Sequence, residues 1–229
     1  MSDPPAATAF RKAHTAMSPA STKSRSRSRP LYGVHPGVKM VQDWVESLPK
    51  KTGRSLEQWI ALVKKQAPKA QRARSEWLKK AHGLGTNAAW WIAERADGMG
   101  TEDSDPAAYL EAAERYVEEQ YAAKKAHLRP IFDALLKLGL SMGKDVKACP
   151  CKTIVPLYRE HVFAEIKPTT LTRVDLGLAL KDAKTPARLI DTGGFAKKDR
   201  ITRRIPISSV DEIDSEVKRW LKKAYELDR

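Results

Sequence analysis

The chain has 229 residues, of which 41% are hydrophobic and 31% charged, a balance typical of a globular protein with its own core. Its 42 basic and 28 acidic side chains give a formal charge of +14, which favours a polyanionic partner such as DNA or RNA. No apolar run reaches the roughly 18 residues of a membrane span, and the N-terminus lacks the apolar core of a secretory signal. We therefore expect a cytoplasmic protein with no membrane partner.

The two cysteines, Cys149 and Cys151, are separated by a single residue. This spacing is poor for an intrachain disulfide, and two thiols are too few for a structural zinc site. The five histidines show no paired spacing typical of metal ligands, and no catalytic triad order, phosphate loop or dinucleotide motif is present. The sequence predicts a reducing compartment and no metal, cofactor or catalytic residue.

Residues 1–36 are basic and poor in apolar side chains, and they include the run SRSRSRP over 24–30. Such a segment buries too little apolar surface to offset the entropy of ordering. We expect a disordered tail.

Residues 37–97 read as a small domain of three helices. The helices are expected from residue 55 to before Pro68, over 71–81 with Gly83 as the stop, and from Thr86 or Asn87 onward. Ser55 and Gln58 form a capping-box pattern at the first start. In the third helix Ala89, Trp90 and Ile92 are expected on the inner side.

Tryptophans are dense in this domain and could stack on bases. Trp59 and Trp77 lie on apolar helical stripes, so we expect them in the core. Trp90 and Trp91 are adjacent and cannot both face inward on one helix, so one of them should be exposed or covered by the acidic helix that follows.

Residues 98–128 form an acidic connecting segment, in which Asp105 and Pro106 resemble an N-cap and a first-turn proline. Pro130 interrupts or restarts the helix. Residues 129–229 then form an α+β domain, since a helix over 131–142 is followed by a change of the apolar period from 3.6 to 2.

Strands are expected near residues 147–151, 153–158, 162–167, 171–180 and 201–207. Pro156 and Pro206 place two of them on edges or at bulges. Ser209 and Glu212 form a second capping box before a closing amphipathic helix. We expect an antiparallel sheet covered on one face by the first and last helices of the domain, with the other face open.

Six motifs occur in order along the chain: GRSLEQWIALVKK from Gly53, WLKKAHGLGTNAA from Trp77, CKTIVPLY from Cys151, FAEIKP from Phe163, TRVDLGLAL from Thr172 and SSVDEIDSEVKRWLKKAY from Ser208. Together they resemble a family of bacterial proteins that pairs two domains of unknown function, the second sometimes labelled a predicted transport protein. The resemblance covers roughly residues 40–95 and 130–227. The acidic insert over 101–128 is longer than in such proteins, and Arg203 stands where they often have a histidine.

The segment from Gly83 to Ala89 has the spacing of a helix-hairpin-helix loop. Its glycines would let backbone amides at a helix N-terminus approach a phosphate, with lysines beside them. The candidate nucleic-acid-binding residues are Lys79, Lys80, Gly83, Gly85, Thr86 and Asn87. The alternative is a glycine stop followed by an Asn-capped helix with no binding role.

On the open sheet face, a basic pocket with one carboxylate could hold a small anionic ligand. Its candidate residues are Lys152, Arg173, Asp175, Arg203 and Arg204. Arg173 and Asp175 could equally form a solvent-exposed ion pair. A weaker pattern, formed by Asp145, Glu165 and Lys167, is similar to the acid and Glu-x-Lys spacing of metal-dependent nucleases, with a solvated strand face as the alternative.

We therefore expect a binding protein whose basic N-terminal module contacts nucleic acid or another polyanion and whose C-terminal domain holds an anionic ligand or partner. An enzyme acting on a nucleotide or nucleic acid at the open sheet face is the first alternative. A structural interaction module is the second.

Overall fold

The computed structural model describes residues 30–184 and 186–229, so most of the predicted tail lies outside the described residues. The described end of that tail is packed. Tyr32 is buried in the C-terminal core, and the amide of Gly33 donates to the carbonyl of Ala148 at 2.9 Å. The predicted boundary at residue 36 is wrong, because the packed chain already begins near residue 31.

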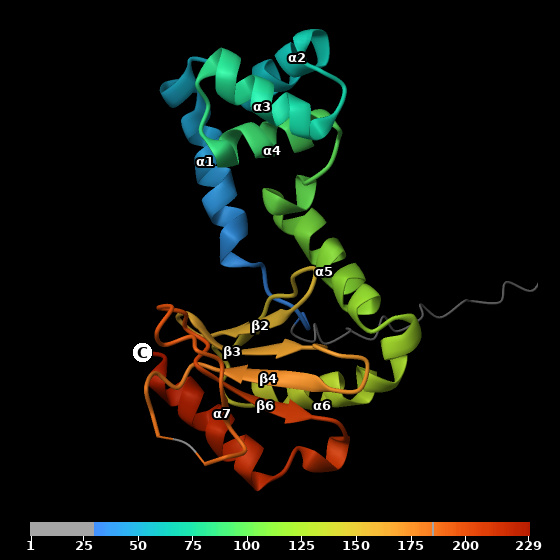
Figure 1. The fold of residues 1–229 in the computed structure, drawn as a ribbon, viewed down its shortest axis with the longest axis vertical. Coiled ribbons are helices and arrows are strands. Elements are labelled where there is room, and N and C mark those ends of the chain that lie inside the picture. The colour runs from blue at the N-terminus through green and yellow to red at the C-terminus, as the bar shows by residue number, and fades with distance from the viewer. Residues whose placement is uncertain (1–29, 185) are drawn as a thin grey trace, which may run out of the picture. The chain divides into compact units, whose positions relative to one another are not determined.

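Four α-helices, not three, make up the N-terminal helical region (Figure 1). They are α1 (Pro36–Thr52), α2 (Leu56–Gln66), α3 (Gln71–His82) and α4 (Thr86–Ala96). The sequence signals missed α1 because its cap is unusual: the imidazole Nδ1 of His35 accepts from the amide of Gly37 at 2.9 Å. Pro49 inside its last turn also obscures the pattern.

Apolar side chains from all four helices and from the turn between α3 and α4 form one small core. Its buried members are Leu48, Trp59, Val63, Leu78, Leu84, Ala89, Ile92, Ala93 and Ala96. The predicted capping box at the start of α2 is confirmed, with both of its reciprocal bonds between Ser55 and Gln58 present.

The acidic helix α5 (Pro106–Gln120) follows a 3₁₀ turn, η1 (Thr101–Asp103). Its predicted N-cap is present, since the Asp105 carboxylate accepts from the amides of Ala107 and Ala108. The apolar side of α5 is buried in the C-terminal core through Tyr109, Val117 and neighbouring residues. The helix therefore belongs to that core and does not merely connect two domains.

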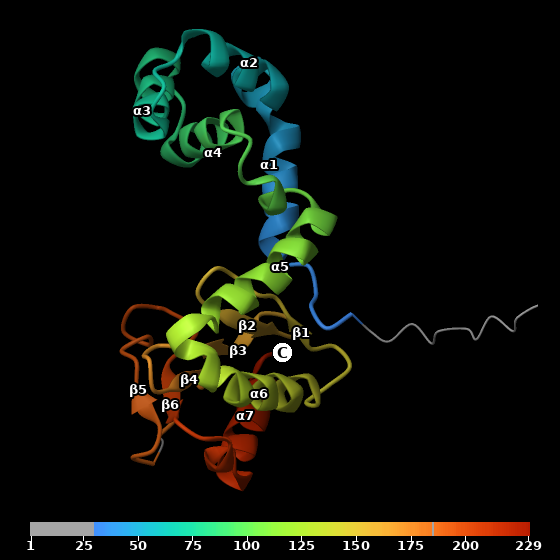
Figure 2. The same cartoon turned by 90° about the vertical axis from the view of Figure 1, so that its right-hand side faces the viewer.

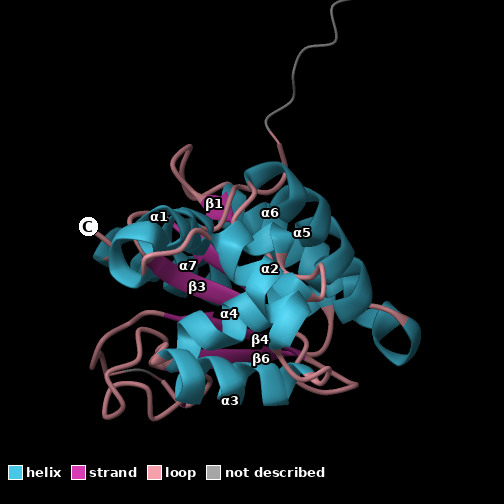
Figure 3. Cartoon of the chain, turned by 90° about the horizontal axis from the view of Figure 1, so that it is seen from above, coloured by secondary structure: helices cyan, strands magenta, loops and turns pink. Residues whose placement is uncertain are grey.

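The C-terminal part contains one six-stranded antiparallel sheet, in which β3, β4 and β6 lie side by side (Figure 3). Its strands are β1 (Lys147–Ala148), β2 (Val155–Tyr158), β3 (Val162–Lys167), β4 (Val174–Leu178), β5 (Ile190–Asp191) and β6 (Arg203–Ile207), in the spatial order β1-β2-β3-β4-β6-β5. The sequence did not indicate β5, because two residues are too few for a period of 2 to be visible.

Two helices cover one face of this sheet, α6 (Arg129–Leu140) after the 3₁₀ segment η2 (Ala123–Leu128), and α7 (Ser215–Leu227) (Figure 2). Both contribute to the core that includes Ile166, Leu176 and Leu178 of the sheet. The predicted α+β class, with an antiparallel sheet flanked by the first and last helices of the domain, is confirmed. The expectation of an open opposite face is wrong at β4, because Asp175 and Gly177 on that face are buried and Ile201 packs over Gly177.

The start of α7 differs from the prediction. Ser209 precedes a separate 3₁₀ turn, η3 (Val210–Glu212), and makes no side-chain cap. The helix is instead capped by Asp214, whose carboxylate accepts from the amides of Glu216 and Val217.

The prolines of β2 and β6 lie in strands that are second from each edge. The outer strands are only two residues long and pair with neither proline. The carbonyl of Pro156 accepts from the amide of Cys149, so its missing donor also faces this short outer neighbour. A register shift between Leu157 and Tyr158 adds the expected bulge in β2.

Among the described residues, none of the helices combines the length and the apolar composition that crossing a bilayer requires.

Candidate functional site

The turn between α3 and α4 exposes a helix N-terminus. Gly83 ends α3 in the left-handed conformation with φ 67°, which favours glycine. Gly85 precedes α4 with φ −65°, and a Cβ atom built on it would meet no atom within 4 Å. No side chain caps α4, and Thr86 and Asn87 are exposed. The first-turn amides therefore remain available to an external acceptor.

The alternative reading, a glycine stop followed by an Asn-capped helix, is half present: Gly83 is the stop, but no Asn caps α4. Asn87 lies inside the first turn of α4 rather than at its cap. Since an N-cap side chain would occupy the same amides that a phosphate needs, its absence keeps the loop geometry compatible with anion contact.

The two lysines of α3 next to this turn differ in their contacts. Lys79 pairs with Glu76 at 3.1 Å, one turn earlier on the same helix, while Lys80 is exposed and makes no ion pair with a described residue. The Glu76 pairing is solvent-exposed and worth little, so it leaves Lys79 able to exchange its partner for a phosphate.

A groove of about 450 Å³ lies beside the glycine turn. It is lined by Gly83 and Gly85 together with two further cationic side chains, Lys51 and Arg54. His82 also lines it, with its ring between the indoles of Trp59 and Trp77, at centroid distances of 5.3 and 4.5 Å. The four cations around the turn thus come from α3, from the last turn of α1 and from the loop that follows α1.

Much of the positive charge of the helical region is not neutralised internally. Residues 38–100 carry twelve basic and six acidic side chains. The described basic residues without an ion pair in this region are Lys50, Lys51, Arg54, Lys64, Lys65, Lys69, Arg72 and Lys80. Such a surface attracts polyanions.

The adjacent tryptophans of α4 separate as expected, one inward and one outward. The expected direction of Trp90 was wrong: it is 45% exposed, whereas Trp91 lies edge-on against Trp44 of α1 at 4.8 Å. Trp59 is buried in the core and Trp77 is partly buried beside it. An exposed indole on α4, the helix that begins at the glycine turn, can stack on a base.

In the C-terminal domain, three of the five predicted pocket residues meet. Asp175 is buried on β4, and its two oxygens accept from Arg173 Nε and Arg204 Nη1, each at 3.0 Å. Both arginines are thus engaged by one carboxylate, which leaves little free charge for a ligand. The ion pair foreseen as the alternative is present, but it is buried rather than solvent-exposed at Asp175.

The other two residues do not join this cluster, so the predicted convergence is wrong. Arg203 pairs with Leu178 across the ladder, which puts it on the helix-covered face, and its guanidinium contacts Asp191 at 3.1 Å. Arg204, one residue further along β6, lies on the opposite face of the sheet because side chains alternate along a strand. Lys152 lies beyond β1 in a loop near Glu102. Burial acts to raise the pKa of that carboxyl, but a backbone hydrogen bond, the Tyr116 hydroxyl and the charge of Lys152 together hold it below its usual value.

The nuclease-like triplet does not assemble either. The carboxylate of Asp145 accepts from Arg159 at 2.8 Å and from the Tyr225 hydroxyl at 2.9 Å. Glu165 is on β3, where burial raises its pKa. Within residues 30–184 and 186–229 no group of three or more metal-ligating side chains comes together.

Both cysteines are free thiols. Cys149 is buried, and burial raises the pKa of its thiol to about 12, which makes it unreactive near neutral pH.

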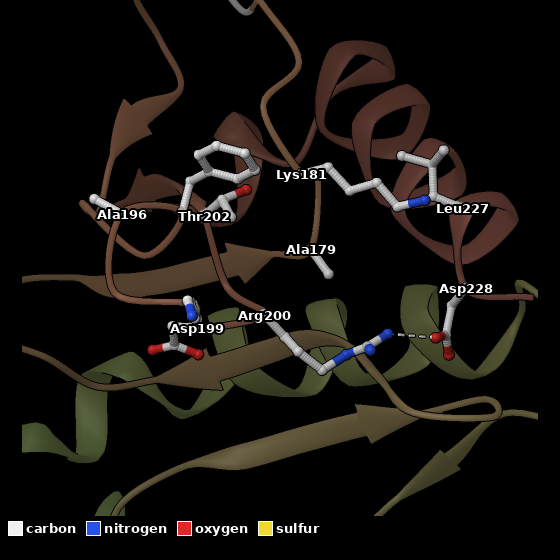
Figure 4. Close-up of a pocket in the computed structure, with 10 residues that line it drawn as sticks. Ala179, Lys181, Ala196, Asp199, Arg200, Thr202, Leu227 and Asp228 are labelled. Atoms are coloured by element: carbon white, nitrogen blue, oxygen red, sulfur yellow. Dashed lines mark hydrogen bonds and ion pairs between the residues drawn. The ribbon is translucent and has the colours of Figure 1, made fainter.

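The sequence reading missed a pocket at the end of α7 (Figure 4). It is formed by the segment after β4, the loop before β6 and the last residues of α7. The only local signal was the composition of residues 191–200, DTGGFAKKDR, which combines glycines and cations as binding loops often do.

The fold and these sites define an α+β protein with a basic helical region and a separate sheet domain. The chain carries two domains of unknown function in N-to-C order: residues 41–98 match Domain of unknown function (DUF4287), and residues 117–228 match Domain of unknown function (DUF5655). The pairing inferred from the motifs is thereby confirmed. The second match begins inside α5, in agreement with the burial of that helix in the C-terminal core.

No curated protein and no solved structure matches the chain.

Proposed function

We propose that the protein is a non-enzymatic, cytoplasmic binding protein whose helical region contacts the phosphate backbone of DNA or RNA through the turn between α3 and α4. The carrying observation is the uncapped start of α4 behind two exposed glycines, with Lys80 exposed near the end of α3 and with Lys51 and Arg54 in the groove that the glycines line. Backbone amides and point charges at this spacing suit a phosphate group.

Contacts of this kind carry no base-edge information. Binding should therefore be indifferent to sequence and strongly dependent on salt, because each phosphate contact releases counterions from the nucleic acid. The measurement is fluorescence anisotropy of labelled duplex DNA, single-stranded DNA and RNA over a salt series.

The chain contains its own matched control for the lysines. The sequence WLKKA occurs at residues 77–81 of α3 and again at 220–224 of α7. In both places the leucine is fully buried, so the two lysine pairs are placed on comparable helical surfaces. Only the α3 pair adjoins the glycine turn.

The double variant Lys79→Ala with Lys80→Ala should weaken binding to all three nucleic acids alike. It should also flatten the slope of log K against log salt by roughly one to two. Lys222→Ala with Lys223→Ala removes the same charge from α7 and should leave the slope close to that of the parent. Equal losses from the two pairs would show that only net charge matters, and the proposed turn contact would be rejected.

Gly85→Val tests the backbone contact. The added side chain finds open space in the free protein, so folding should be preserved, yet it blocks approach to the first amides of α4. Loss of binding with an unchanged melting temperature is expected. Unchanged binding would show that the nucleic acid does not contact the first backbone amides of α4.

A further inference from the structure

A pocket of about 490 Å³ in the C-terminal domain has the composition of a small-molecule site. We propose that it binds a small aromatic anion, meaning a flat apolar ring that carries a phosphate or carboxylate group. This site is independent of the nucleic-acid contact on the helical region, and neither proposal depends on the other.

The cations of the pocket favour a single anionic group. Lys181 and Lys198 both line it, both are exposed, and neither forms an ion pair with a described residue. The third cation, Arg200, is already engaged by Asp228 at 2.6 Å. The one further acid, Asp199, cannot balance two lysines. The pocket therefore has an unmatched positive charge.

The backbone at both lysines has a left-handed conformation, which residues other than glycine rarely adopt. Lys181 and Lys198 have φ values of 53° and 57°, and Ala123 is the one other described non-glycine residue with positive φ. Glycine would adopt this conformation without strain. Such positions concentrate at ligand sites, where the side chain has a role that offsets the strain.

The wall of the pocket is built around a buried carboxylate. The Asp228 side chain is 1% exposed and accepts from Arg200 Nη2, from the backbone amide of His161 at 2.9 Å and from the ring Nδ1 of His161 at 3.2 Å. Figure 4 shows Arg200 directed at Asp228, with Lys181 extending toward the same end of α7. These bonds fix the pocket before any ligand arrives.

An apolar surface completes the site. Ala179, Ala196 and Leu227 line the pocket together with Phe195, whose side chain is 58% exposed. An exposed phenyl ring beside two unpaired lysines matches a ligand that is aromatic at one end and anionic at the other.

The experiment tests the anionic group and the aromatic ring of the ligand separately and together. Phenyl phosphate, inorganic phosphate and phenol are each titrated into the full-length protein, and binding is followed by NMR chemical shifts of residues 179–202 and 227–228. We expect phenyl phosphate to bind at least about tenfold more tightly than inorganic phosphate or phenol, since only it contacts both the lysines and the apolar wall.

Glycine variants then separate binding from folding. Lys181→Gly and Lys198→Gly remove a charge and relieve a strained backbone position together, so each should weaken phenyl phosphate binding about threefold to tenfold without lowering the melting temperature. Lys197→Ala is the control, since this exposed neighbour does not line the pocket. Phe195→Ala should weaken phenyl phosphate and leave inorganic phosphate unchanged.

Three results would overturn the proposal. One is phenyl phosphate that binds no better than inorganic phosphate. Another is a Lys197→Ala variant that loses as much affinity as Lys181→Gly and Lys198→Gly, since the effect would then be general surface charge. The last is a set of shifts located away from residues 179–202 and 227–228. None of these outcomes bears on DNA or RNA binding by the helical region, which is measured separately.

Discussion

The two copies of WLKKA show how one local sequence serves two different surfaces. In both, the leucine is fully buried and the tryptophan is partly buried, so the helical period alone determines the packing. Beyond the repeat the copies diverge. In α3 the chain reaches Gly83 and an uncapped helix start, whereas in α7 Lys223 lies over the ring of Trp220 and Tyr225 packs edge-on against Phe163.

The arginines of the two regions differ in a related way. In the C-terminal domain they are largely engaged by carboxylates, as in the pairs of Arg173 and Arg204 with Asp175 and of Arg200 with Asp228. In the helical region Arg54 and Arg72 have no ion-pair partner among the described residues, and most described lysines of both regions have none. An unpaired cation therefore marks a candidate anion site only where another feature accompanies it, such as the uncapped start of α4 or the pocket at the end of α7.

In the helical region, the largest loss of stability is expected from truncating a large side chain of its small core. Trp59 is 1% exposed and donates from its indole Nε1 to Thr52 at 2.9 Å. Trp59→Ala should lower the free energy of unfolding by about 3–5 kcal/mol, because it leaves a large cavity. Urea denaturation measures this. Trp90→Ala removes the same side chain from an exposed position and should change stability by less than about 0.5 kcal/mol; similar losses at both sites would contradict the assigned core.

Removing Asp175 tests whether the ion pairs of Arg173 and Arg204 with this carboxylate stabilise the C-terminal domain. Asp175→Ala should lower the free energy of unfolding by about 1.5–3 kcal/mol, since two charge-assisted hydrogen bonds are lost at a buried position. Asp182, which is exposed, provides the control: Asp182→Ala should be nearly neutral. An equally neutral Asp175→Ala would show that the arginines gain nothing from this pairing.

A pair of glycine variants compares close packing in the sheet with open space in the turn. A Cβ on Gly177 would lie 2.6 Å from Glu165 Cγ and 2.8 Å from Ile201 Cγ2. Gly177→Ala should therefore destabilise by about 1–3 kcal/mol. Gly85→Ala meets no atom, and its gain through the unfolded chain is offset by the poorer N-cap preference of alanine, so the change should stay within about 0.5 kcal/mol. Thermal unfolding distinguishes the two, and the reverse order would contradict the described packing.

The cap of α1 predicts a pH dependence. Burial lowers the pKa of His35, whose Nδ1 must be unprotonated to accept from Gly37. The unfolded chain binds the proton first as pH falls below about 6.5, so this contribution to stability is present above that pH and is lost as pH falls toward the folded-state pKa. Losing the cap should cost about 1 kcal/mol.

The melting temperature of the parent protein between about pH 8 and pH 5 should fall more than that of His35→Asn. Asparagine can cap the helix without titrating. Parallel pH profiles for the two proteins would exclude His35 as the titrating group.

The sequence by itself determined the elements whose signals are local. The capping box at Ser55 and the Asp105 and Pro106 helix start follow from spacing along a few residues, and the structure retains both. The strand expected over 171–180 is present as β4, but all five of its residues are buried, so the half-buried strand that a period of 2 indicates is not what the structure has. The two domains of unknown function were recognisable for the same reason, since their motifs are short and occur in order.

Only the tertiary structure decided which residues share a site. Arg203 and Arg204 are neighbours in the chain, but the register of β6 against β4 sends them to opposite faces. Helix α1 was invisible because its cap is a histidine. Tyr32 is buried because it reaches a core built, apart from Val38, from residues more than 70 positions later. The Asp228 pocket brings together residues 179–202 and the end of α7, a contact between distant segments that no local pattern encodes.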